Sequence, residues 1–188
     1  MKMQTIKWQD RIIHGRDEVL LDIERRANTF GDQVVQDARS IMHDYEVDMY
    51  RLVIAIGKRF GMDTAYEIMS DTVAEKRLKW LNQVKPELDL IGTDVDKGLG
   101  LYLKYFKPKE ADFYVVELTE ERVVFKRKDF VNAIAYACNI LGLDVIEVNN
   151  KVYARAMALR FEEIQLFVKH VYLQYQDGWY DEMIEKSH

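Results

Sequence analysis

Apolar residues in the first third of the chain recur at helical spacing. They follow one another at intervals of three or four residues, close to the ~3.6 residues of an α-helical turn. The series is Leu20, Ile23, Ala27, Phe30, Val34, Ala38, Ile41, Tyr45, Met49, Leu52 and Ile56. This pattern predicts one long amphipathic helix with a straight apolar stripe. Such a stripe favours packing across a globular body or a second copy over an extended coiled coil.

Glycine and proline mark the limits of the expected helices. Gly31 with Asp32 leaves open a break in the long helix, since glycine weakens a helix interior and aspartate caps a new one. Gly61 is expected just after its end, with Asp63 or Thr64 capping a second helix that Pro86 closes. A shorter helix is predicted over 94–106, before the next proline.

Residues typical of strands become frequent from Phe113 onward. The segments 113–118 and 123–128 are rich in Val, Phe and Tyr and flank a four-residue loop, which predicts a β-hairpin. Residues 165–175 fit either a helix or a strand. Their β-branched and aromatic side chains favour a strand that pairs with the hairpin. Residues 179–184 are interpreted as an aromatic and acidic tail.

Two more helices are expected between the hairpin and that strand. The first runs over 130–142 and ends at Gly142, and the second covers 151–161 after Asn149 and Asn150. The elements together predict a helix-rich α+β fold, in which long N-terminal helices pack with a small antiparallel sheet and C-terminal helices. The 188 residues fit a single domain, 1–188, comprising a helical arm (1–60), helices (61–110) and an α+β portion (111–188).

Composition and charge exclude several classes of partner. Hydrophobic residues make up 48% of the chain and charged residues 31%, which suffices for a core and is atypical of disorder. The net charge is −5, and no run of five like charges occurs. We therefore expect neither nonspecific nucleic-acid binding nor attachment to an anionic membrane. The longest uncharged run, 130–143, is too short to span a bilayer.

The single cysteine, Cys138, bears on compartment and chemistry. An intramolecular disulfide is impossible, and residues 1–17 lack the apolar stretch of a secretion signal, so a cytoplasmic location is expected. Cys138 lies among alanines and isoleucines, with no neighbouring cation to activate a thiolate. It is predicted to be a small core residue. A zinc site built from several thiolates is excluded.

Other motifs give little support for a metal or a cofactor. Glu185 and His188 have the spacing of a dimetal ligand pair but stand at the end of the sequence, and His43 with Glu46 fits a solvated helix face better than a metal site. The Gly-x-Gly at 98–100 lacks a third glycine and predicts close helix packing instead of phosphate binding. Neither a cofactor nor a metal is expected.

The best candidates for a ligand site lie after residue 110, where most of the tyrosines occur. If 165–175 is a strand, His170 shares one face with Val168 and Tyr172. A satisfied core histidine is the simpler interpretation of this pattern. The alternative is a pocket in which Tyr153 and Arg155 join His170 and Tyr172, because a few polar groups in an apolar cavity orient a ligand.

Three stretches of the chain carry a resemblance to a known family. They are the helix end 50–53 leading into 60–65, the hairpin region 113–125, and the helix 130–142 that ends in Leu-Gly. The segment order over 48–175 resembles the L-2-amino-thiazoline-4-carboxylic acid hydrolase-like proteins. Family members carry a cysteine near the start of the helix after the hairpin, where this chain has Lys128-Asp129-Phe130. No catalytic residue is therefore transferred. A looser similarity to 4-vinyl-reductase-type domains implies a small-molecule pocket between helices and sheet.

These observations lead to two main hypotheses. The first is a small-molecule-binding module that forms a homo-oligomer through its helical arm, because a long exposed apolar stripe calls for a partner. The second, implied by the resemblance, is a hydrolase or lyase for an amino-acid-like substrate, with His170, Glu162 or Glu163 as the general base. A helical adaptor without a pocket is a third possibility. The sequence leaves open whether the protein is an enzyme.

Overall fold

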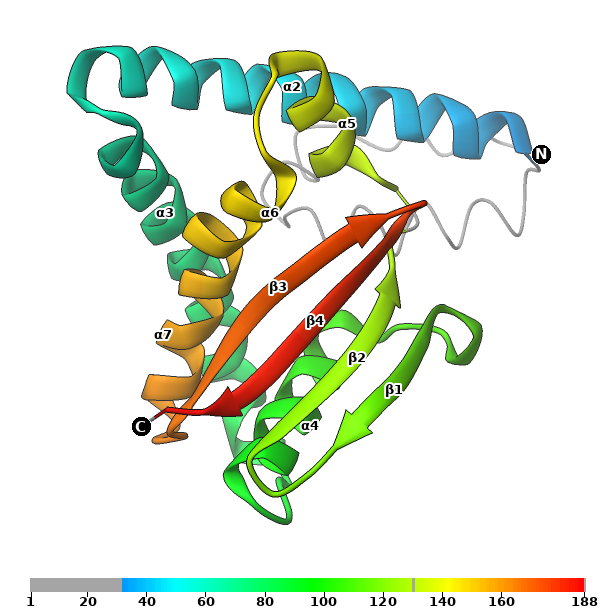
Figure 1. The fold of residues 1–188 in the computed structure, drawn as a ribbon, viewed down its shortest axis with the longest axis vertical. Helices are drawn as coiled ribbons and strands as arrows, with labels where there is room; N and C mark the ends of the chain where they lie inside the picture. The colour runs from blue at the N-terminus through cyan, green and yellow to red at the C-terminus, as the bar shows by residue number, and fades with distance from the viewer. Residues whose placement is uncertain (1–31, 130, 188) are drawn as a thin grey trace, which may run out of the picture.

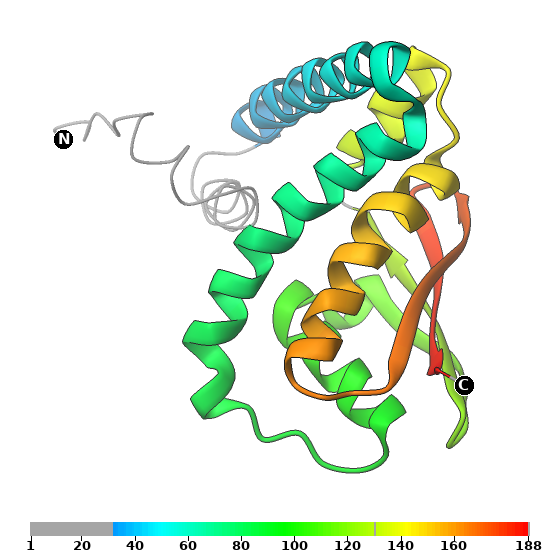
Figure 2. The same ribbon diagram turned by 90° about the vertical axis from the view of Figure 1, so that its left-hand side faces the viewer.

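Helices pack against one face of an antiparallel sheet, as Figure 1 and Figure 2 show from two sides. This computed structural model describes residues 32–129 and 131–187, so the predicted arm from Leu20 to Gly31 lies outside the described residues. The helices are α2 (Asp32–Phe60), α3 (Met62–Val84), α4 (Asp94–Phe106), α5 (Ala133–Leu141), α6 (Val145–Val148) and α7 (Arg155–Glu163). The strands are β1 (Phe113–Leu118), β2 (Arg122–Lys128), β3 (Val168–Gln176) and β4 (Trp179–Lys186). Short 3₁₀ turns cover η1 (Lys85–Glu87) and η2 (Glu110–Asp112), and η3 (Asn149–Ala154) is a π-helical segment.

The strands of the described region form one four-stranded sheet in the order β1-β2-β4-β3, with antiparallel neighbours throughout. Helices α4 and α7 lie against one face, with α3 behind α7, and α2 and α5 lie across one end (Figure 2). The opposite face is turned toward the viewer in Figure 1, and none of the described helices covers it. This arrangement confirms the predicted helix-rich α+β fold with a small antiparallel sheet.

Strand β4 is the main departure from the predicted topology. Residues 165–175 do contain a strand, β3, but it pairs with β4 and not with the hairpin. Residues 179–184, predicted as a tail, belong to β4, which lies between β2 and β3. Along β4, Tyr180, Glu182 and Ile184 are buried and alternate with half-buried residues. The buried Glu182 hides this alternation in the sequence, because a carboxylate rarely marks an inward position.

The local signals of the hairpin and of α4 are confirmed. β1 and β2 flank a short loop in which the Thr119 amide donates to the Arg122 carbonyl at 2.9 Å. Helix α4 spans the predicted residues, and Thr93 and Asp96 cap it reciprocally. Gly98 packs closely against the sheet, as predicted. A methyl group there would lie 3.1 Å from Val168 Cγ2 and 3.2 Å from Ile184 Cγ2.

Gly61 separates α2 from α3, as its sequence position predicts. Its φ of 93° belongs to the region that glycine alone adopts freely, and its amide donates to the Gly57 carbonyl at 2.8 Å. The predicted cap at Asp63 or Thr64 is wrong, because α3 begins at Met62 with Gly61 as its N-cap. The left-handed turn lets the second helix start one residue after the first ends.

The helical segment after Gly142 starts earlier than predicted. Asp144 caps α6, accepting hydrogen bonds from the Ile146 and Glu147 amides at 2.7 and 2.9 Å. The chain then continues through η3 into α7, so Asn149 and Asn150 lie inside helical structure and not before it. A π-helical segment holds more residues per turn, and it changes which side chains face the sheet.

The buried face of α2 also differs from the predicted stripe. Ile41, Tyr45 and Leu52 belong to that stripe, yet they are 48%, 55% and 57% exposed. The core side of α2 carries a neighbouring row of residues, namely Met42, Glu46, Val47, Tyr50 and Val53. The two rows are adjacent on one helix, and the buried Glu46 breaks the apolar pattern of the true core row. An apolar strip therefore remains on the outside of α2.

Two apolar clusters make up most of the described core. One joins α2, α3, α5 and η3 to the sheet at Tyr172 and Tyr180. The other joins α4 and α7 to the sheet at Phe125, Val168 and Ile184. A layer of polar side chains lies between them on the inner face of the sheet. Within the described residues, no helix is both long enough and apolar enough to cross a membrane.

Candidate functional site

The polar layer is centred on the carboxylate of Glu182, whose side chain is fully buried. Tyr102 from α4 donates its hydroxyl to both carboxylate oxygens at 2.9 Å. Arg127 from β2 lies 2.9 Å from Oε1 through Nε, and His170 from β3 lies 2.7 Å from Oε2 through Nε2. Side chains from α4, β2 and β3 thus converge on one carboxylate of β4.

These contacts determine the charge of the carboxylate. Burial raises the pKa of Glu182, but Arg127 and the hydrogen bonds from His170 and Tyr102 outweigh it, and the pKa lies below its ordinary value. For Arg127, burial alone would lower the pKa of the guanidinium group. The nearby Glu182 carboxylate outweighs that effect, so the pKa of Arg127 lies above its ordinary value. The pair is therefore ionised inside the protein.

His170 is neutral in this setting. Burial lowers its pKa below the ordinary value, and Arg127 and Arg160 reinforce the shift, while Glu182 opposes it. Because the Glu182 carboxylate can only accept, Nε2 of a neutral imidazole must carry the proton. The other ring nitrogen, Nδ1, is then an acceptor. It is fully buried and has no hydrogen-bond partner among the described residues.

Two aromatic rings pack against the His170 imidazole. The rings of Tyr102 and Tyr172 lie 5.4 and 4.7 Å from the His170 ring, measured between centroids. Burial strongly raises the pKa of the Tyr102 hydroxyl, which therefore stays protonated. Two further guanidinium groups lie nearby: Arg160 is 4.1 Å above the Tyr105 ring, and Arg77 is 5.3 Å from it. Polar and aromatic groups thus meet in one buried layer.

The π-helical segment η3 fixes one side of the layer. The Asn150 side chain donates to the Tyr172 carbonyl at 2.9 Å and accepts from the Tyr172 amide at 2.8 Å. This double contact lies beside the irregularity of β3 between Tyr172 and Gln174. One turn later, Tyr153 accepts a hydrogen bond from the Tyr50 hydroxyl of α2 at 3.2 Å. π-helical segments are common at functional sites.

The structure brings together three of the four predicted ligand-binding residues. His170, Tyr172 and Tyr153 are buried on the inner side of the sheet. Arg155 is not with them. It lies on the other side of the helix, since residues two apart on a helix do not face each other, and it pairs with Glu67 at 2.8 Å and Asp71 at 3.5 Å. The predicted site therefore has to be corrected by removing Arg155.

The two predicted alternatives to His170 as a general base lie at the surface. Glu162 and Glu163 are exposed at the end of α7. Glu163 forms an ion pair with Lys85 at 3.1 Å. Neither carboxylate belongs to the buried layer, so His170 is the remaining candidate of the three.

Sequence reasoning missed three members of the layer. Glu182 belongs to the segment that was interpreted as a tail, and Arg127 belongs to a predicted strand noted for its apolar residues. Tyr102 lies before residue 110, outside the part of the chain in which a site was expected. A signal did exist for Glu182, since it occupies the inward register between Tyr180 and Ile184. Reading β4 as a strand would have placed a carboxylate opposite Tyr172.

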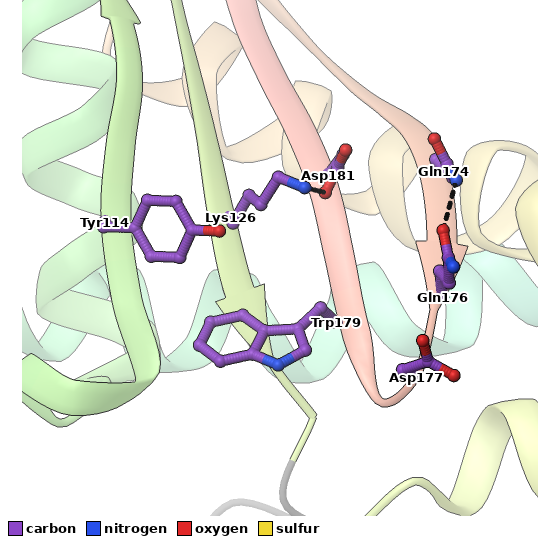
Figure 3. A pocket seen from close by; sticks show the side chains of 7 residues that line it. All are labelled: Tyr114, Lys126, Gln174, Gln176, Asp177, Trp179 and Asp181. Carbon is purple, nitrogen blue, oxygen red and sulfur yellow. Dashed lines mark hydrogen bonds and ion pairs between the residues drawn. The ribbon is translucent and has the colours of Figure 1, made fainter.

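Two shallow depressions lie outside the polar layer. One, of about 280 Å³, lies between α3 and η3 and includes Arg155 and Tyr66. The other, of about 190 Å³, lies on the outer face of the sheet (Figure 3). Its lining residues are Tyr114, Lys126, Gln174, Gln176, Asp177, Trp179 and Asp181. Both are smaller than the ~300–1,000 Å³ typical of pockets for drug-sized ligands.

The remaining candidates from the sequence have structural roles. Cys138 is buried, and burial raises the pKa of its thiol to about 12, so it is not a nucleophile near neutral pH. His43 stacks on Tyr136, with ring centroids 4.2 Å apart, and its Nε2 lies 2.8 Å from the Val131 carbonyl oxygen. The described part of the chain contains no group of three or more His, Cys, Asp or Glu side chains placed to hold a metal ion.

Comparison with known proteins adds no relative. No family model matches the chain, and neither the curated proteins nor the solved structures contain a significant match.

Proposed function

We propose that this protein is a small-molecule-binding module whose ligand contacts His170 in the polar layer. The observation that carries this proposal is the His170 Nδ1 atom, a buried acceptor with no partner among the described residues. A buried polar atom without a hydrogen bond is unfavourable by about 1–3 kcal/mol. A ligand that donates a hydrogen bond there would remove this penalty.

The surroundings of Nδ1 indicate the kind of ligand. The rings of Tyr102 and Tyr172 pack against the imidazole, so a small aromatic molecule with one hydroxyl or N–H donor is favoured. The two depressions described above lie elsewhere. Side chains of the layer must therefore move to admit a ligand, and we expect binding to be slow.

Phenol and toluene provide a matched pair of probes, because they differ in a single donor. We expect phenol to raise the unfolding temperature more than toluene does at equal concentration. His170→Phe should abolish this difference, and His43→Gln should leave it intact. Native mass spectrometry of freshly purified protein should also reveal a retained small molecule. Equal effects of the two probes on the wild-type protein would refute the proposal.

A hydrolase or lyase is the second candidate, and the His170–Glu182 pair favours it. A carboxylate that fixes one imidazole nitrogen leaves the other as a base, which is the arrangement of many general-base catalysts. The family resemblance points to L-2-amino-thiazoline-4-carboxylate as the substrate to test. Enzymatic loss of this compound that disappears in His170→Gln would support catalysis. Turnover that persists in His170→Gln would exclude His170 as the base.

We also propose that the protein forms a homodimer through its helical arm in the cytoplasm. The exposed strip of α2, with Ile41, Tyr45 and Leu52, supports the first part, since a second copy could bury it. The single, buried Cys138 fits a reducing compartment. Light scattering should give a dimer mass at micromolar concentration, and Tyr45→Glu with Leu52→Glu should give a monomer. A monomeric wild-type protein would exclude the dimer.

A further inference from the structure

The outer face of the sheet carries an aromatic and amide-rich strip that the proposed ligand site does not use. One rung of the ladder aligns Tyr114, Lys126, Asp181 and Gln174 across all four strands, and the next aligns Lys128, Trp179 and Gln176. Figure 3 shows the Tyr114 and Trp179 rings toward β1, the two glutamines on β3, and Lys126 with Asp181 between them. These side chains line the depression of about 190 Å³.

The two aromatic rings form an accessible platform. Their centroids are 5.6 Å apart and their planes meet at 58°, and Tyr114 is 50% exposed. Lys128 covers Trp179 from 5.9 Å, which limits the movement of the indole. Aromatic rings held in place on the surface of a sheet keep apolar area in contact with water, and a binding partner would remove that area from water.

The depression contains both paired polar groups and polar groups without a partner among the described residues. Asp181 is engaged by Lys126 at 3.1 Å, and Gln176 Oε1 accepts from Gln174 Nε2 at 3.1 Å. In contrast, the Tyr114 hydroxyl, the Trp179 indole N–H and the Gln176 amide N–H₂ have no hydrogen-bond partner in the part of the chain described. The strip therefore offers aromatic surface together with free donors.

We propose that this strip binds a proline-rich peptide in the polyproline II conformation. Such a segment presents flat pyrrolidine rings and carbonyl acceptors, and its proline nitrogens carry no hydrogen to donate. Aromatic-lined grooves recognise it through ring packing and donation to its carbonyls. This chemistry matches the aromatic rings and the free donors of the strip. At the open side of the depression, the Asp177 carboxylate adds an acceptor suited to a basic residue beside the prolines.

Strand spacing gives the length of the recognised segment. The distance from β1 to β3 is three strand spacings, or about 14 Å. A polyproline II chain rises about 3.1 Å per residue, so about five residues cross the strip. We therefore expect a short motif with two prolines over the rings and its carbonyls directed at Trp179 and Gln176.

Charge disfavours a nucleic acid as the occupant. Lys126 is neutralised by Asp181, Asp177 adds a negative charge, and the whole chain has a net charge of −5. Strong binding of a phosphate backbone requires several uncompensated cations. A saccharide would also stack on the two rings, so the test below includes cellohexaose as the competing occupant.

Fluorescence polarisation of a fluorescein-labelled, end-blocked decaproline peptide tests the proposal with the full chain. Saturable binding to the wild-type protein is expected. Trp179→Ala and Tyr114→Ala should each weaken it by at least about tenfold, as truncation of an aromatic anchor does. Tyr114→Phe keeps the ring and removes the donor, so a smaller loss of about three- to tenfold is expected. Phe167→Ala, an exposed aromatic residue outside the strip, should bind like the wild type.

Several results would overturn the proposal. These are no saturable binding by the wild-type protein, unchanged affinity in both alanine variants, or tighter binding of a ten-residue oligothymidylate or of cellohexaose at the same residues. Circular dichroism verifies that each variant is folded. If Trp179→Ala does not fold, Tyr114→Phe and Gln176→Ala decide the question, because both residues are exposed and each variant removes a donor of the strip. Normal affinity in both would refute the proposal.

Discussion

His170 and Glu182 are diagonal neighbours on adjacent antiparallel strands, with Nε2 2.7 Å from Oε2 and neither side chain exposed. In the register of the sheet, His170 is opposite Ile184, and Glu182 is opposite Tyr172. The contact joins the two C-terminal strands at the centre of the polar layer. The same carboxylate also binds Tyr102 and Arg127, so its loss affects three elements at once.

Glu182→Gln should strongly destabilise the fold. The variant leaves Arg127 buried without its counter-charge, and breaking such a buried pair costs about 3–5 kcal/mol. The free energy of unfolding, measured by urea denaturation, should fall by that amount. Asp181→Asn is the matched control on the outer face of the same strand, where an exposed pair contributes about 0–1 kcal/mol. A loss below 1 kcal/mol in Glu182→Gln would contradict the described network.

Stability should fall as the pH is lowered from 7 to 4. The pKa of His170 in the folded protein lies below its ordinary value of 6.5, so between the two values the unfolded chain binds more protons. The His170 contribution is therefore complete above about pH 6.5 and is lost as the pH falls toward the folded pKa. The pKa of Glu182 is also lowered, so its contribution is lost in the same way below about pH 4.5.

Urea midpoints at several pH values test this dependence. His170→Gln should flatten the slope between pH 7 and 5 and leave the slope below pH 4.5 in place. A wild-type midpoint that does not change between pH 7 and 5 would mean that His170 is not held neutral. A variant slope equal to that of the wild type would assign the effect to another group.

Gly98→Ala should destabilise the protein, whereas Gly100→Ala should not. Added to Gly98, a methyl group meets two side chains of the sheet core, Val168 and Ile184, and overpacking costs about 1–3 kcal/mol. At Gly100 it meets only Leu90 at 3.2 Å, a half-buried side chain in a loop that can move. Alanine favours a helix over glycine by up to about 1 kcal/mol. Thermal unfolding should show Gly98→Ala destabilised and Gly100→Ala neutral or stabilised, and the reverse order would contradict the packing of α4.

Asn150→Ala should weaken the attachment of η3 to β3. Both hydrogen bonds to the Tyr172 backbone disappear, which leaves buried groups unpaired and costs about 1–3 kcal/mol. Hydrogen exchange should show faster exchange of the Tyr172 amide, together with the lower unfolding free energy. Asn139→Ala removes the same side chain from an exposed position of α5 and should change neither quantity. Equal exchange at Tyr172 in both variants would rule out the double contact.

Sequence patterns predicted the elements that are defined locally. The hairpin, α4 and the break at Gly61 depend on residues close to one another in the chain, and β3 depends on its β-branched and aromatic residues. The sheet order was not predictable in this way. It depends on β4, whose inward position at Glu182 is compensated by Arg127, Tyr102 and His170 from other elements.

Only those residues of the candidate site that are recognisable from local sequence patterns were predicted. His170, Tyr172 and Tyr153 were found because they are aromatic or titratable residues on apolar faces. Arg155 was included for its guanidinium group alone, and residues two apart on a helix, such as Tyr153 and Arg155, do not face the same side. The buried row of α2 was missed because Glu46 interrupts it, while the exposed row reads as continuous.

The polar layer between the two apolar clusters has a consequence for folding cooperativity. Helix α3 contributes to both clusters, but of these two clusters α2 and α5 contribute only to the first and α4 only to the second. On the inner face of β3 and β4, His170 and Glu182 separate the apolar side chains of one cluster from those of the other. Hydrogen bonds and ion pairs depend on geometry more sharply than apolar contacts do. The polar layer therefore couples the folding of the two clusters only while its hydrogen-bonded partners stay aligned. The end of the molecule that holds α2 and α5 can therefore unfold as a unit before the end that holds α4. The polar layer is then the boundary between two cooperative folding units.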